Sequence, residues 1–356
     1  MSRSIVFAWA AAFVLVCFVP PALAQKLNPD LSVIGDVRAQ AVDTDGESTQ
    51  SLELHEVEVG LAGALNPYAS AAVYLGIHGT EGIEVEEAKL TLDRYLPASL
   101  ALTAGQSLLD FGQINPRHRH AFPWLDAPLM HQEFFGEDGA RDVTARLDWL
   151  APTTGVAIRA SAGVLGGTSL LGGHDHGAED DSGDTEEDAP ELGASGRLEL
   201  FAEPSGSVSF AIGGSVLHGV YDPADGAHAT WLDVDAKFNV DLGPARKLVL
   251  QVEGVKGTLE ASEETSTQDP TGYFAVADLR LDRRWNVGGW AESTAERAED
   301  SIRTNRYGGF VGLQLMEETT VFRVVARRTS PDEAPATNEL ILQALFSLGP
   351  HQSHRF

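Results

Sequence analysis

Two segments of the chain combine histidines with carboxylates, and imidazole nitrogens and carboxylate oxygens together can hold a divalent cation. One of them, 166–195, has almost no apolar residues beside its acids, so we expect a disordered outer loop. Its candidate metal ligands are His174, Asp175, His176, Glu179, Asp180 and Asp181. The sequence predicts a weak site for Zn²⁺ or another divalent cation there. A solvated acidic loop without a metal explains the same composition.

The second segment, 113–140, joins charged residues with large apolar ones such as Phe122, Trp124 and Phe134. Loops exposed to water are usually polar, so this one must bury its apolar side chains inside the protein or against a partner. We expect it to fold inward and to line a constriction. The candidate constriction residues are Arg117, His118, Arg119, His120, Asp126, His131, Glu133, Glu137 and Asp138.

Within this segment we expect the basic run 117–120 to face the acids at 126, 133, 137 and 138. The alternative is a metal site made by His118, His120, Asp126 and His131. Histidines two residues apart on an extended segment point the same way, so both could reach one ion. The neighbouring Arg117 and Arg119 would repel a cation, which favours a structural polar network.

The elements that must position these segments follow a period of two. In 232–241 every even residue is apolar and every odd residue is polar, and similar alternation recurs at 142–149, 208–213 and 340–348. Successive side chains of a strand point to opposite faces, so each segment has one apolar and one polar face. Because the polar faces carry charges, they suit a water-filled lumen better than the interior of a sandwich.

Short turns alternate with mostly longer polar connections. The turns fall near 66–67, 97–98, 152–153, 204–205, 243–244, 284–285 and 317–318. The longer connections fall near 43–51, 79–82, 113–140, 166–195, 221–227, 259–270, 294–300 and 328–338. This order predicts an all-β fold, a transmembrane antiparallel barrel of about 16 strands. By this count 113–140 is the third outer loop, the one expected to fold into the lumen.

The two ends of the chain predict export and assembly. Residues 1–24 have Arg3, an apolar run and a small-residue ending, which is typical of a signal peptide for Sec-dependent export. We therefore expect the mature barrel to comprise 25–356. The single cysteine, Cys17, lies in the signal, so the mature chain has no disulfide. The terminal Phe356 is the aromatic residue that barrel-assembly machinery typically recognises.

The formal net charge of −27 makes nucleic acid an implausible partner, because binding it needs clustered lysines and arginines. An acidic surface favours cations and suits an outer membrane where divalent ions bridge lipopolysaccharide. No nucleotide-binding glycine loop or HExxH pattern is present, and the histidines have no motif-based serine partner, so we expect no enzyme and no required cofactor.

Several motifs carry a resemblance to a known family. They are GQSLLDFG at 105–112, NP at 115–116, HRH at 118–120, FPW at 122–124, PL at 128–129, FFGEDG at 134–139, RD at 141–142 and SLGPH at 347–351. The chain here resembles Gram-negative outer-membrane proteins loosely described as zinc-regulated or TonB-dependent-receptor-like. The resemblance implies a porin-like barrel connected with metal acquisition. A TonB-dependent receptor, however, needs a plug and about 22 strands, for which the chain has no room.

Together these observations predict an outer-membrane channel that passes small solutes or metal ions, with a link to the uptake of zinc or another divalent cation. The alternative is a receptor-like barrel that binds metal at the cell surface and has no open pore. A homotrimer in outer-membrane lipid is compatible with either.

Overall fold

The computed structural model describes residues 29–79, 82–168, 170, 191–262, 266–315 and 319–349. Three predictions lie outside these residues: the signal peptide at 1–24, the outer-loop metal ligands between 174 and 181, and the role of Phe356.

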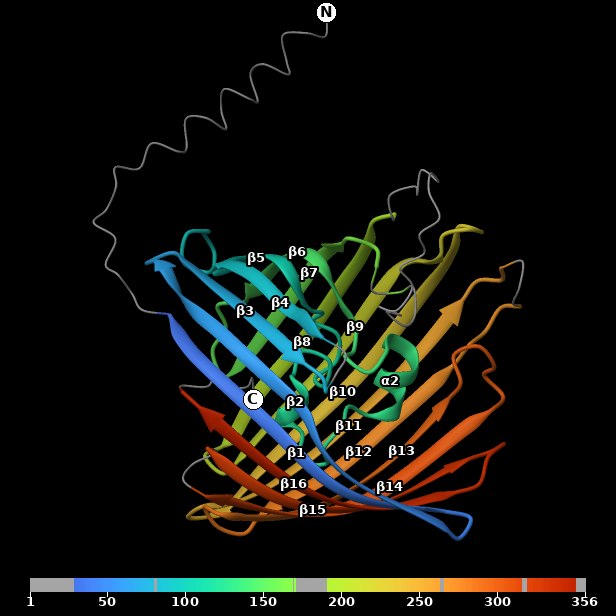
Figure 1. The fold of residues 1–356 in the computed structure, drawn as a ribbon. Helices are drawn as coiled ribbons and strands as arrows, with labels where there is room; N and C mark the ends of the chain where they lie inside the picture. Colours follow the sequence, from blue (N-terminus) through green and yellow to red (C-terminus); the bar gives the residue numbers. More distant parts are fainter. Residues whose placement is uncertain are drawn as a thin grey trace, which may run out of the picture.

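Sixteen antiparallel strands close into one barrel, as the alternating pattern predicts. Each strand pairs with its neighbours in sequence, and the first pairs with the last (Figure 1). The strands are β1 (Asp30–Thr44), β2 (Glu47–Asn66), β3 (Ala69–Ile77), β4 (Ile83–Leu92), β5 (Leu100–Leu108), β6 (Arg141–Leu150), β7 (Val156–Leu165), β8 (Gly193–Ser205), β9 (Val208–Asp222), β10 (Ala227–Gly243), β11 (Arg246–Leu259), β12 (Thr271–Arg280), β13 (Trp285–Ala295), β14 (Arg303–Leu315), β15 (Thr320–Pro331) and β16 (Thr337–Leu348).

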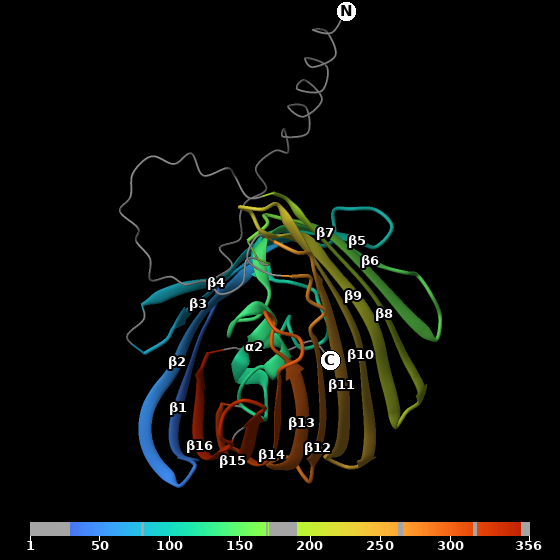
Figure 2. The same ribbon diagram turned by 90° about the vertical axis from the view of Figure 1, so that its right-hand side faces the viewer.

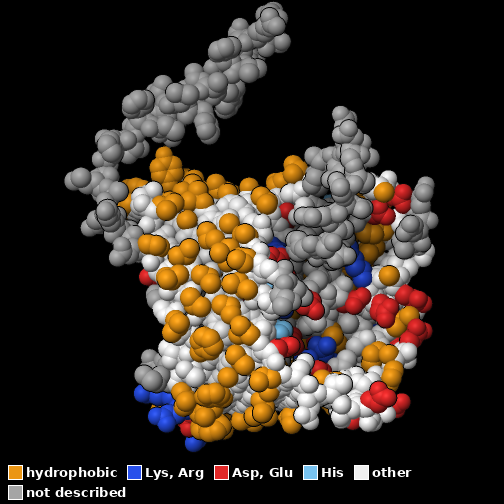
Figure 3. Space-filling model, viewed as in Figure 1, with side chains coloured by type: hydrophobic (Ala, Val, Ile, Leu, Met, Phe, Trp, Pro, Cys, Tyr) orange, Lys and Arg blue, Asp and Glu red, His pale blue; other side chains and the backbone are white. Residues whose placement is uncertain are grey.

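The alternation along each strand separates an apolar outer wall from a polar lumen. In β10, Leu232 and Val234 are 51% and 67% exposed, whereas Asp233 and Asp235 are buried. Apolar side chains cover much of the outer wall (Figure 3). An outward apolar band is what a barrel needs in order to contact lipid. Among the described residues, no helix is long and apolar enough to cross a bilayer.

The predicted turns at described residues lie between strands or at strand ends, but the connection predicted at 43–51 is far shorter than expected. Strand β1 continues to Thr44 and β2 starts at Glu47, so only Asp45 and Gly46 connect them. Both have positive φ, 54° and 87°, and Asp-Gly is the pair that favours a two-residue hairpin turn. The polar residues after the turn extend the hairpin as strand.

The third outer connection lies inside the barrel, as predicted. Between β5 and β6 the chain forms a 3₁₀ helix, η1 (Arg119–Ala121), and a short helix, α2 (Leu129–Phe135). Figure 2 places α2 within the ring of strands. We call residues 109–140 the inner loop.

Candidate constriction site

The apolar side chains of the inner loop form one core with inward residues of the wall. Phe134 of α2 and Trp231 of β10 are fully buried, with ring centroids 4.7 Å apart. Trp124 lies 4.8 Å from Phe274 of β12 in the same way. Burying each large apolar side chain contributes roughly 1.5–3 kcal/mol, so this packing holds the loop against the wall. The aromatic side chains of the loop are therefore buried by packing inside the barrel, and their burial does not require a partner protein.

A buried glutamate of β11 anchors the start of the loop. Glu253 accepts hydrogen bonds from the backbone N–H groups of Gln113 and Ile114, at 2.9 and 3.1 Å. His131 Nε2 lies 2.7 Å from the other oxygen of Glu253. Gly112 has a φ of +64°, and a Cβ there would lie 2.5 Å from Glu253. A glycine is required at this close approach because any side chain would strain the backbone and displace the carboxylate.

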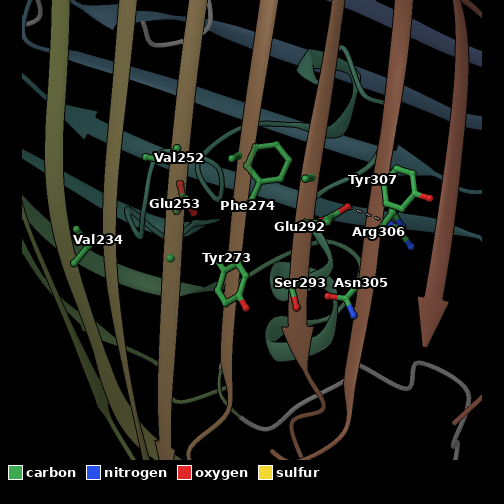
Figure 4. Close-up of a pocket in the computed structure, with 13 residues that line it drawn as sticks. Val234, Val252, Glu253, Tyr273, Phe274, Glu292, Ser293, Asn305, Arg306 and Tyr307 are labelled. Carbon is green, nitrogen blue, oxygen red and sulfur yellow. Dashed lines mark ion pairs between the residues drawn. The ribbon is translucent and has the colours of Figure 1, made fainter. Parts of the chain in front are cut away.

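A second buried carboxylate holds the start of α2. Glu292 of β13 accepts a hydrogen bond from the backbone N–H of Leu129 at 2.6 Å and another from Trp290 Nε1 at 3.1 Å. Such an N–H has no partner within the helix, and a negative charge is favourable beside it. Arg306 of β14 faces Glu292 at 3.8 Å (Figure 4).

The wall at this place also carries a cavity of about 630 Å³ along β10 to β14 (Figure 4). Its lining includes Tyr273 and Tyr307, which are 56% and 55% exposed on the outward face of the wall. The inward neighbours Glu253 and Glu292 are the two anchors of the inner loop. The cavity therefore lies in the wall beside the inner loop. It is not the constriction itself.

Asp126 ties the loop to strands β1 and β15 of the wall. Its two oxygens lie 2.7 Å from Arg38 of β1 and 2.5 Å from Arg327 of β15. Burial alone would raise the pKa of Asp126, but the two arginines outweigh it and hold the pKa below its ordinary value. The carboxylate is thus ionised, and it is a second carboxylate partner for Arg38, which also pairs with Asp36, and for Arg327, which also pairs with Glu339. We call this group the Asp126 bridge.

The predicted network within the loop is confirmed only for Arg119, which lies 2.6 Å from Asp138 and 3.6 Å from Glu137. Burial lowers the pKa of Arg117, and the carboxylates acting against this effect belong to the wall, Glu253 first. Glu133 accepts a hydrogen bond from the backbone N–H of Arg297, in the β13–β14 connection. For Asp126 and Glu133 the predicted pairing with 117–120 is replaced by contacts with arginines far away in sequence, on β1 and β15 and in the β13–β14 connection.

His118 and His120 point to the side of the lumen formed by β2, β3 and β4. Nδ1 of His118 lies 3.0 Å from Glu58 and 3.0 Å from Glu86, and Nδ1 of His120 lies 3.2 Å from Glu58. Burial by itself would lower the pKa of His118, but its hydrogen bond to Glu86 and its close contact with the carboxylate of Glu58 raise that pKa well above the ordinary value. We call these four residues the His–Glu cluster.

Two β-bulges create this cluster. One leaves His55 without a partner on β1, because Asp36 pairs with Glu56 and Val37 with Leu54. The inward face of β2 thereby changes from odd to even residues, which turns Glu56 and Glu58 into the lumen. The second bulge leaves Glu86 unpaired between Val85 and Glu87, and both glutamates are buried. Bulges commonly re-aim side chains at functional sites.

The structure separates the four residues of the alternative metal site. His118 and His120 join β2 and β4, Asp126 lies between two arginines, and His131 contacts Glu253. The wall residues that complete these contacts were missed at the sequence level. For Glu253 a signal existed, since Gln251 and Glu253 alternate with the apolar Leu250 and Val252. For Glu58 and Glu86 the signal was hidden by the bulges.

Comparisons with known proteins agree on the type of barrel. An anion-selective porin from Comamonas acidovorans has a TM-score of 0.61 at 12% identity, covering 90% of this chain and 99% of the porin. The outer-membrane channel DcaP of Acinetobacter baumannii has a TM-score of 0.58 at 11% identity, covering 92% and 100%.

In sequence, an uncharacterised protein of Aquifex aeolicus is 26% identical over 328 residues, covering 81% of this chain and 68% of that protein. No family model matches the chain, so the resemblance to zinc-regulated or TonB-dependent proteins has no family match behind it. The structural likenesses show that the chain has the sixteen-stranded transmembrane barrel fold of Gram-negative outer-membrane porins.

Proposed function

We propose that the protein is a porin-like channel of the outer membrane that passes small solutes and cations through a constriction formed by the inner loop. The observation that carries this proposal is the position of the loop. A long segment with its own apolar core and charged residues crosses the lumen of a closed barrel and is anchored at Glu253, Glu292 and the Asp126 bridge. A segment placed there controls the width and the charge of any path through the barrel.

The charge of the lumen supports a preference for cations. Among the buried charged residues described, carboxylates outnumber arginines. The carboxylates are Asp36, Glu56, Glu58, Glu86, Glu87, Asp110, Asp142, Asp233, Asp235, Glu253 and Glu292, and the arginines are Arg38, Arg141, Arg146, Arg197 and Arg323. Rings and clusters of carboxylates favour cations in pores. The porin from Comamonas acidovorans, which is described as anion-selective, therefore shares the fold but is not expected to share the selectivity.

A homotrimer in outer-membrane lipid and lipopolysaccharide fits this function, with assembly through the terminal Phe356. An OmpT protein of Vibrio cholerae, described as a trimer form, aligns with a TM-score of 0.56 at 9% identity. Passage of zinc or another divalent cation belongs to the same proposal, and the excess of carboxylates in the lumen supports it.

One observation favours the second candidate, a receptor-like barrel without an open pore. Residues of the inner loop and of β9 to β16 form a single buried apolar cluster, so this part of the lumen is filled. In that case the loop acts as a binding platform held inside the barrel.

Uptake by proteoliposomes separates the two functions. We expect liposomes that contain the purified protein to swell in isotonic solutions of small uncharged sugars, and to swell more slowly as the sugar becomes larger. Protein-free liposomes and liposomes with heat-denatured protein are the controls. Folded protein that gives no more swelling than the controls would contradict the channel and support the closed barrel.

A further inference from the structure

We propose that the His–Glu cluster, Glu58, Glu86, His118 and His120, is a binding site for one divalent transition-metal ion of the zinc type. The site lies between the inner loop and strands β2 and β4. Its four residues are none of the ligands that the sequence predicts in the acidic segment 166–195.

The distances between the histidines and the glutamates are close to those of such a site. Glu58 Oε2 lies 3.0 Å from Nδ1 of His118 and 3.2 Å from Nδ1 of His120, and Glu86 Oε2 lies 3.0 Å from Nδ1 of His118. A tetrahedral ion with bonds of about 2.0–2.2 Å separates its ligand atoms by roughly 3.3–3.6 Å. The three measured separations are a few tenths of an ångström shorter than that, and one ligand atom from each of Glu58, Glu86 and His118 lies within 4.8 Å of the other two. Two imidazoles with two carboxylates form a ligand set that zinc and its neighbours accept.

The charge of the cluster also calls for a cation. Glu58 is 1% exposed, and neither of its oxygens accepts a hydrogen bond of good geometry in the described part of the chain. Glu56 and Glu86 are buried with it, and an oxygen of each lies within 4.8 Å of the other. Burying a carboxylate without a full set of partners is costly. An ion with two positive charges would satisfy several of these oxygens at once.

The basic residues near the cluster already form ion pairs with carboxylates outside it. Lys89 pairs with Glu87, Arg119 with Asp138, and Arg141 with Glu84. The repulsion expected from Arg117 is also small, because the carboxylates that act on it belong to the far strands β8, β10 and β11. The two histidines are therefore the basic groups that face Glu58 and Glu86, and a metal ion that binds them displaces their ring protons.

The local backbone is shaped to hold these side chains together. The bulge at Glu86 directs two consecutive glutamates of β4 into the lumen. Gly76 of β3 leaves the necessary space, since a Cβ there would lie 2.4 Å from Glu86 and 2.9 Å from His78. The histidine rings of the loop stack with centroids 5.8 Å apart, which brings both Nδ1 atoms toward Glu58.

Metal binding by the folded, chelator-treated full-length protein tests this site directly. Zn²⁺ is titrated calorimetrically, and Co²⁺ is added separately to record the visible absorption of its coordination sphere. To remove ligands of the outer loop, every protein carries His174→Ala and His176→Ala. In this background we expect one Zn²⁺ per chain. We expect His118→Ala and Glu58→Gln to weaken its binding by more than the roughly 10- to 100-fold that loss of an outer-shell partner costs.

His131→Gln is the matched control, because His131 is another buried histidine of the same loop but contacts Glu253 instead. This variant should keep the Zn²⁺ and the Co²⁺ spectrum. Folding of each variant is checked by its heat-dependent shift in gel mobility. The proposal is overturned if the background protein binds no Zn²⁺, or if His118→Ala and Glu58→Gln bind it as tightly as the background does. Neither result depends on whether the barrel conducts, so this test and that of the proposed function can fail separately.

Discussion

Deletion of residues 118–135, with the ends joined by a short glycine-serine linker, is expected to raise the single-channel conductance several-fold. The deletion removes η1 and α2 together with Trp124, Phe134 and the Asp126 bridge, which lie inside the barrel. The strands and their pairing remain, because the contacts that close the barrel run between neighbouring strands. Conductance increases when the narrowest part of a water-filled path widens, and planar-bilayer recording measures that change.

The acidic outer segment offers a deletion of equal length as a control. Residues 172–189 also number eighteen, and the sequence predicts a polar loop without an apolar core. Removing them should leave the conductance close to that of the wild type. Equal conductance of the wild type and the 118–135 deletion, with both barrels folded, would show that the inner loop does not limit the pore.

Asp126→Asn is expected to have the second-largest effect. It removes the carboxylate between Arg38 and Arg327, which then keep only Asp36 and Glu339 as their carboxylate partners. Removing one partner of a fully buried ion pair costs roughly 3–5 kcal/mol, and we expect less here because the Asp126 side chain is still 19% exposed. The loop should detach part of the time, so recordings should show extra, larger conductance levels. The exposed arginines should also weaken the preference for cations.

The pH dependence of this bridge follows from the lowered pKa of Asp126. Its stabilising contribution is present above the unfolded-state pKa of about 3.9, and it is lost only as the pH falls through the lower pKa of the folded state. Wild-type recordings at pH 5 and pH 7 should therefore lack the extra levels of Asp126→Asn. Glu137→Gln is the control for loss of a charge on the same loop, because its side chain is 82% exposed and lies 3.6 Å from Arg119. If Asp126→Asn and Glu137→Gln showed the same conductance levels, the Asp126 bridge would not be what holds the loop in place.

The barrel could be predicted from the sequence because its cause is local. Each strand shows its two faces in consecutive residues, as Leu232 to Asp241 do, and the turns lie where proline, glycine and short polar pairs interrupt the alternation. The hairpin at Asp45 and Gly46 was missed because the polar residues 47–51 look like a loop. In the structure they pair with β1 along the barrel rim.

The inner loop could be predicted for the same reason, since its apolar residues have to be buried somewhere. The contacts that the inner loop makes with the wall could not be predicted from the sequence. His118 meets Glu58 and Glu86, which lie far away in sequence, and Asp126 meets Arg327 across 201 residues. Two single-residue bulges decide which glutamates of β2 and β4 face the lumen. A one-residue shift reverses the faces of a strand, so alternation alone could not place them.

Planar-bilayer recording of the purified wild-type protein, with a salt gradient across the membrane, tests the central claim most directly. The structure predicts discrete conductance steps and a reversal potential of the sign that indicates a preference for cations. The absence of steps from folded protein, both in the wild type and in the 118–135 deletion, would contradict a channel constricted by the inner loop.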